Sequence, residues 1–65
     1  MKIKDLLKLF NNDVYFSIKI IDSEHVTICQ EVTTAEKFMN NHPCKILNDI
    51  LDIEIGNKEV IFHIK

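Results

Sequence analysis

The chain has 65 residues, of which 46% are hydrophobic and 28% charged, and its formal net charge is −2. This length predicts a single domain over residues 1–65, close to the size at which one core only just offsets chain entropy, and the composition excludes a disordered tail. No apolar run approaches the roughly 20 residues of a spanning helix, and arginine is absent, so neither a membrane protein nor a dedicated nucleic-acid binder is expected.

The first predicted element is an amphipathic helix over Lys2–Phe10. Its polar face is small, which favours packing on a sheet over the alternative of a helix lying on a membrane surface. Asn11–Asp13 then supplies a polar stop and turn. The apolar residues that recur at the helical spacing are Ile3, Leu6, Leu7 and Phe10.

Two segments of alternating polarity follow, residues 14–21 and 25–32, and they predict an antiparallel hairpin. A connection of three residues, 22–24, keeps the apolar faces matched and places Ile18 opposite Ile28. The residues expected on the inner face are Val14, Phe16, Ile18, Ile20, Val26, Ile28 and Val32.

A second helix is predicted to begin at a capping box formed by Thr33 and Glu36, in which each side chain serves a backbone donor of the other. The helix should end at His42, because the residue before Pro43 is pushed out of the helical region. A further short helical turn is expected around Ile46.

Residues 50–65 predict the hairpin around which the rest of the chain is organised. A two-residue loop over Gly56 and Asn57 would set Glu54 against Glu59, whereas a four-residue loop over residues 56–59 avoids this repulsion and is therefore expected. The longer loop pairs Ile55 with Val60, Ile53 with Phe62 and Leu51 with Ile64 on the inner face, and Asp52 with His63 on the outer face.

Together these elements predict an α+β fold in the order α-β-β-α-β-β, with helices packed on a four-stranded, mainly antiparallel sheet. If both helices cover one face, several apolar side chains remain on the other face and predict a partner-binding surface; helices on opposite faces are the alternative. The same surplus and the small size predict a two-fold homodimer that forms through the outer sheet face or an exposed strand edge. The expected partner-binding residues are Tyr15, Ile21, Cys29, Ile50, Ile61 and His63.

The residues that could carry chemistry do not form a recognisable site. His25 and Cys29 are four residues apart, and in a strand this spacing separates their Cα atoms by about 13 Å, too far to share an ion. No base is expected beside Cys29, no pocket beside Asp52 and Glu54, and Gly56 is the only glycine, so no phosphate loop exists. We therefore expect neither an enzyme nor a metal or cofactor site. The possible metal ligands considered are His25, Cys29, His42, Cys44 and His63.

The opening MKIKDLLKLF, with the polar turn and alternating strand after it, and the closing residues 50–64 resemble short proteins of bacteriophages and other bacterial mobile elements. Some of those proteins are anti-CRISPR or other counter-defence inhibitors. The resemblance implies a small non-enzymatic protein that binds and blocks a host protein, although the modest charge departs from strongly acidic DNA mimics. Asp5, where a signal peptide would continue apolar, predicts a cytoplasmic location. The alternative is a multimeric binder of a nucleotide signal, with Lys19 or Lys45 at a site between subunits.

Overall fold

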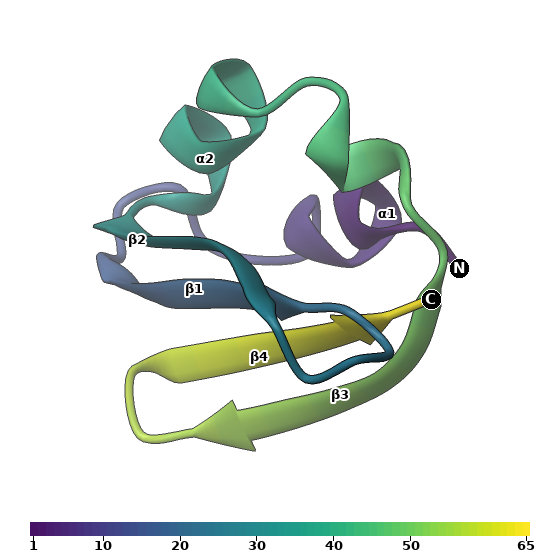
Figure 1. Ribbon diagram of the computed structural model, residues 1–65. Coiled ribbons are helices and arrows are strands. Elements are labelled where there is room, and N and C mark those ends of the chain that lie inside the picture. The colour runs from purple at the N-terminus through teal and green to yellow at the C-terminus, as the bar shows by residue number, and fades with distance from the viewer.

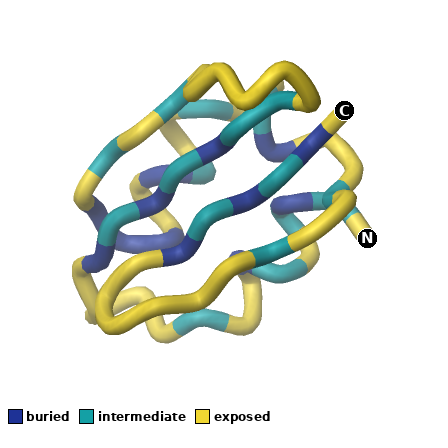
Figure 2. The backbone as a smooth tube through the Cα atoms, turned by 60° about the horizontal axis from the view of Figure 1, so that its bottom comes forward, coloured by how far each residue is buried: buried dark blue, intermediate teal, exposed yellow.

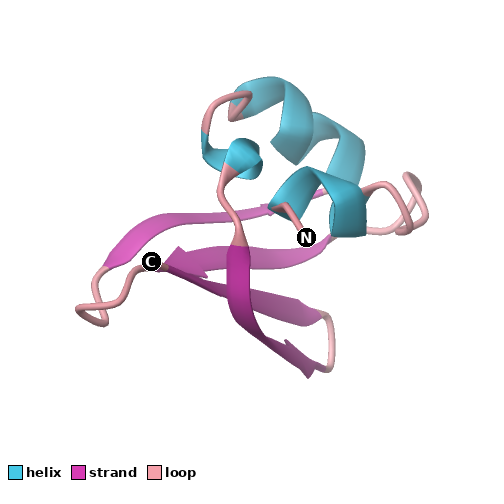
Figure 3. Cartoon of the chain, turned by 90° about the vertical axis from the view of Figure 1, so that its right-hand side faces the viewer, coloured by secondary structure: helices cyan, strands magenta, loops and turns pink.

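The computed structural model describes residues 1–65 and places two helices on one face of a four-stranded sheet (Figures 1 and 3). The order α-β-β-α-β-β and the α+β class are confirmed. The elements are α1 (Ile3–Leu7), β1 (Phe16–Ile21), β2 (Thr27–Thr33), α2 (Ala35–Asn41), the 3-10 turn η1 (Lys45–Leu47), β3 (Ile50–Gly56) and β4 (Glu59–Ile64).

The strands are arranged in the order β2-β1-β4-β3. Each sequential hairpin is antiparallel, and the two inner strands, β1 and β4, run parallel. The parallel pair arises because the segment containing α2 and η1 crosses over the sheet between the two hairpins, as a parallel connection requires. The sheet is therefore mainly antiparallel, as predicted, with β2 and β3 at its edges.

The core lies between the helices and the sheet. Along β1 buried side chains alternate with half-buried ones, as expected for a strand with one covered face, and Figure 2 shows this alternation on the inner strands. Phe38 of α2 and Phe62 of β4 are the largest fully buried side chains. The buried hydrophobic residues are Ile3, Leu7, Phe16, Ile18, Ile20, Ala35, Phe38, Ile46, Val60, Phe62 and Ile64.

The helix α1 is shorter than predicted, since only Ile3–Leu7 is helical and the chain turns over the next residues. Phe10 nevertheless packs at the border of the core, where its ring stacks on Phe16 with the ring centroids 5.0 Å apart. Neither helix has the length or the apolar stretch that a membrane crossing requires.

The register of β1 and β2 differs from the predicted one, and as a result the side chains of β2 that were expected to face the core face away from it. Ile18 lies opposite Glu31 and not opposite Ile28, and the register shifts again beside Ile20. The side chain of Cys29, opposite Ile20, therefore faces the helices. The prediction that the apolar residues of this segment lie in the core was wrong, and the exposed ones are Val26, Ile28 and Val32.

Two features cause the difference, and the first is a turn between these strands that is longer than the predicted three residues. The Asp22 carboxylate accepts hydrogen bonds from the backbone N–H groups of Glu24 and Val26, at 2.9 and 3.0 Å. His25 adopts a left-handed backbone conformation with φ 63°. This Asp-stabilised turn sets Ile21 opposite Thr27, which shifts the predicted register by two residues and keeps the predicted faces. A bulge at Ile28 then adds one residue, so that Ile20 lies opposite Cys29, and this odd shift reverses the faces of β2.

The predicted capping box at the start of α2 is also wrong. Thr34 is the cap, and its hydroxyl accepts a hydrogen bond from the backbone N–H of Lys37 at 3.2 Å. Thr33 instead ends β2, where it lies opposite Phe16 in the ladder. The predicted end of the helix at His42 and the short turn after Pro43 are confirmed.

The register of the second hairpin is confirmed over most of its length, including Asp52 opposite His63. Gly56 and Glu59 also pair, so the connection is a two-residue turn over Asn57 and Lys58, and the predicted four-residue loop is wrong although the register is the same. At the start of β3 a bulge leaves Leu51 outside the ladder and exposed, and it places Ile50 opposite Ile64, contrary to the prediction. The confirmed pairs are Ile55–Val60, Ile53–Phe62 and Asp52–His63.

Candidate functional site

One face of the sheet carries no helix, and we call it the uncovered face (Figure 3). β1, β4 and β3 each direct alternate side chains away from the core, and the pairing of the strands brings these outward side chains next to one another. The middle of the uncovered face is formed by Lys19, Ile21, Ile61, His63, Glu54 and Asp52.

The uncovered face combines an apolar middle with an acidic side. Ile21 and Ile61 are half-buried residues of the two inner strands, and Lys19 lies directly beside Ile61. Toward the β3 edge, Glu54 lies opposite Ile61 and Asp52 lies opposite His63. An apolar surface bordered by carboxylates is therefore open to solvent.

His63 is held within this acidic side. Its Nε2 lies 2.8 Å from a carboxylate oxygen of Glu54, which is diagonal to it across the β3–β4 ladder. The Glu54 side chain is largely exposed, so this pair contributes little to stability and chiefly fixes the orientation of the ring.

Three of the predicted partner-binding residues, Ile21, Ile61 and His63, lie on the uncovered face as expected. Their spacing follows from the parallel pairing of β1 and β4, in which Ile21 lies beside His63. These residues form one continuous surface from strands that are far apart in the sequence.

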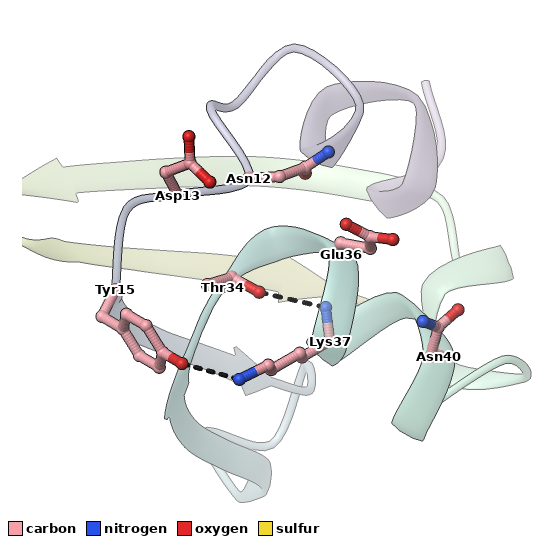
Figure 4. A pocket seen from close by; sticks show the side chains of 7 residues that line it. All are labelled: Asn12, Asp13, Tyr15, Thr34, Glu36, Lys37 and Asn40. Atoms are coloured by element: carbon pink, nitrogen blue, oxygen red, sulfur yellow. Dashed lines mark hydrogen bonds between the residues drawn. The ribbon is translucent and has the colours of Figure 1, made fainter.

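The other three were placed wrongly. Cys29 faces the helices because of the shifted register, and Ile50 packs against the core because the bulge at Leu51 reverses its direction. Tyr15 precedes β1 and lies beside α2, where Lys37 Nζ donates a hydrogen bond to its hydroxyl at 2.6 Å (Figure 4). This bond raises the pKa of Lys37.

On the helix side, Cys29, Glu31 and His42 form a polar cluster between β2 and the end of α2. His42 Nε2 lies 3.0 Å from a Glu31 oxygen and 3.6 Å from Cys29 Sγ. Asn41 donates to the other Glu31 oxygen at 3.1 Å. The hydrogen bond from His42, supported by that from Asn41, holds the pKa of Glu31 below its usual range.

The geometry of this cluster does not match an activated thiol. A nucleophilic cysteine needs a base whose other nitrogen is held by an acid, but here both Cys29 and Glu31 approach the same nitrogen of His42 most closely. Burial raises the pKa of the Cys29 thiol, and the positive charge of Lys45 acts against this effect. The arrangement ties the end of α2 to β2.

A polar pocket of about 400 Å³ opens between the α1–β1 connection and α2 (Figure 4). The Tyr15–Lys37 pair and Thr34 lie in its wall. A smaller groove of about 220 Å³ lies by the tip of the second hairpin, between Phe10, Val14 and Ile55. The pocket's remaining lining residues are Asn12, Asp13, Glu36 and Asn40.

Comparisons of the chain with protein-family models, with curated proteins and with solved structures return no match.

Sequence reasoning missed the polar cluster because the predicted register placed Glu31 on the outer face. One signal was present: His42 follows Phe38 by four residues, so the two share a face of α2, and their rings lie 4.6 Å apart. The Tyr15–Lys37 pair had no comparable signal, because it joins a loop to a helix.

Proposed function

We propose that this protein is a non-enzymatic binding protein that attaches to another protein through the uncovered face. The observation that carries the proposal is the placement of both helices on one side of the sheet, which leaves Ile21 and Ile61 partly exposed on the other. Apolar side chains grouped on an otherwise polar surface are typical of protein interfaces.

The charges on this face define the chemistry of the partner. Asp52 and Glu54 lie on the β3 side, and Lys19 lies nearer the centre. A complementary surface would present apolar side chains next to lysine or arginine, so that the carboxylates meet positive charge. We propose a target of this kind, blocked by occupation of its surface.

The biological setting is part of the same proposal. The resemblance of residues 1–10 and 50–64 to short phage and mobile-element proteins supports a cytoplasmic factor that inhibits a host protein, such as a defence component. A binding protein of this size needs no pocket or catalytic group, since it acts by covering its target.

The test uses a photo-crosslinking amino acid placed at Ile61 on the uncovered face or at Asn40 on the helix side. The proposal predicts that a partner captured from a bacterial lysate crosslinks from position 61 and not from position 40. Ile61→Asp should abolish the capture, and Asn40→Asp, a matched exposed control, should leave it intact. A partner that crosslinks only from position 40, or that is retained by Ile61→Asp, would contradict the proposal. Circular dichroism of each variant confirms the fold.

A second function, binding of a small polar ligand such as a nucleotide, is favoured by the polar pocket beside Lys37. Its volume of about 400 Å³ is large enough for such a ligand, but Lys19 and Lys45, the lysines expected at a ligand site, are not in its wall. A thermal-shift screen of nucleotides decides the matter, since a ligand at a hundredfold excess over its Kd stabilises by about 2.7 kcal/mol. A shift that Lys37→Ala removes would support this function, and no shift with any nucleotide would reject it.

A further inference from the structure

The two edge strands of the sheet differ in how their backbone groups are protected. An edge strand presents a row of N–H and C=O groups that another strand can pair with, and proteins that stay monomeric block this row. In this sheet the edges are β2 and β3.

The β3 edge is protected at its start and at Ile53. At its start, the backbone N–H of Ile50 donates to the Met1 carbonyl at 2.9 Å, and Lys2 and Asp49 form a β-bridge. The Asp52 carboxylate accepts a hydrogen bond from the next free N–H, that of Ile53, at 2.8 Å. The bulge and the acidic side chains also oppose the approach of another strand.

The β2 edge has a bulge at Ile28 but is regular and open from Cys29 to Thr33. Ser17 donates its backbone N–H to Lys58 at 2.9 Å, so its backbone faces β4 and that of its neighbour Ile18 faces β2. Glu31, opposite Ile18, therefore directs its backbone into the sheet, and Gln30 and Val32 direct theirs outward. The side chains of both are exposed. Glu31 carries the only charged side chain of β2, and because this side chain is hydrogen-bonded to Asn41 and His42 it does not oppose the approach of another strand.

We propose that a second copy of this chain pairs with β2 in antiparallel fashion about a two-fold axis at Gln30. This register sets the outward-directed backbone of Gln30 against its own copy and places Ile28 opposite Val32 of the second copy. The two side chains, both exposed in the monomer, then cover each other.

The choice of this register follows from charge. Centring the axis on Glu31 would also align the free backbone groups, but it would set two carboxylates against each other. With the axis at Gln30, no like charges meet, and the acidic β3 edges lie at the far ends of the joined sheet. In the joined sheet the two uncovered faces form one continuous surface. Dimer formation therefore enlarges the surface proposed to bind a target, but it does not require a target.

The test is a charge swap at the axis, followed by sedimentation equilibrium. Gln30→Lys and Gln30→Glu each place like charges directly opposite one another, so each variant alone should raise the dimer Kd at least about tenfold. An equimolar mixture of the two should restore association, because lysine then faces glutamate. Leu51→Lys, which changes an exposed residue of the other edge strand, is the matched control and should leave the Kd unchanged.

Three outcomes overturn the proposal: a wild-type chain that stays monomeric up to about 1 mM, variants that associate as the wild type does, or a mixture that does not recover. Gln30 lies beside Lys19, so Gln30→Lys lowers monomer stability slightly and Gln30→Glu does not. Recovery in the mixture therefore separates loss of the interface from loss of the fold. None of these measurements involves a target protein, so their outcome tests the dimer independently of the proposed function.

Discussion

The inverted register of β2 is tested by making the same chemical change at two valines of the sheet. Val32→Thr and Val60→Thr each replace a methyl group by a hydroxyl and keep the β-branched shape that strands favour. In the structure Val32 is 70% exposed and Val60 is 2% exposed. The predicted register that failed would instead have buried both.

The expected magnitudes follow from these exposures. A hydroxyl buried without a partner costs about 1–3 kcal/mol, so Val60→Thr should lower the free energy of unfolding by that amount. Val32→Thr should change it by less than about 0.5 kcal/mol, because its hydroxyl stays in water. For a domain of this size each kcal/mol shifts Tm by about 4–8 °C, so the variants should differ by roughly 5–20 °C.

Urea or thermal unfolding followed by circular dichroism measures the difference. The protein concentration should be low, since Val32 also lies at the proposed dimer interface and association would add its own stability. Equal destabilisation by Val32→Thr and Val60→Thr would refute the register, because it would place Val32 in the core.

Three further predictions concern single side chains. Thr34→Ala removes the cap of α2 and should cost about 1 kcal/mol in urea unfolding, and an unchanged stability would mean that the cap lies elsewhere. The pKa of Glu31 is lower in the folded protein than its ordinary value of about 4.5, so ionised Glu31 stabilises the fold above that value, and this contribution is lost as the pH falls through the folded pKa. Glu31→Gln should therefore make the free energy of unfolding less dependent on pH in this acidic range and should cost up to about 1 kcal/mol at neutral pH. Iodoacetamide near neutral pH should label exposed Cys44 before Cys29, whose raised pKa and partial burial protect it, and faster labelling of Cys29 in peptide maps would contradict this reading.

The order of the elements could be predicted because each has a strong local pattern. The register of the second hairpin could also be predicted, since a loop over Gly56 and Asn57 would set Glu54 against Glu59, and the predicted pairing of Ile53 with Phe62 is found in the structure. The burial of β1 was also predictable, because its alternation continues from Phe16 to Ile20.

The register of the first hairpin was predicted wrongly because it depends on a turn and a bulge that no glycine marks. Asp22 builds the turn with side-chain hydrogen bonds, and the bulge at Ile28 places the apolar residues of β2 on the exposed side, contrary to the hydrophobic pattern. Long-range contacts could not be predicted from local patterns either, since the hydrogen bond between Met1 and Ile50 that accompanies the β3 bulge joins the first residue to the start of β3.

Amide exchange, measured by NMR at several protein concentrations, tests most directly the central claim that the sheet keeps one edge open for association. The account predicts that the amides of Gln30 and Val32 exchange quickly in dilute solution and slow as the concentration rises. The amide of Ile53, held by Asp52, should show no such dependence. Exchange at Gln30 and Val32 that is slow in dilute solution, or that does not change with concentration, would contradict the open β2 edge and the pairing built on it.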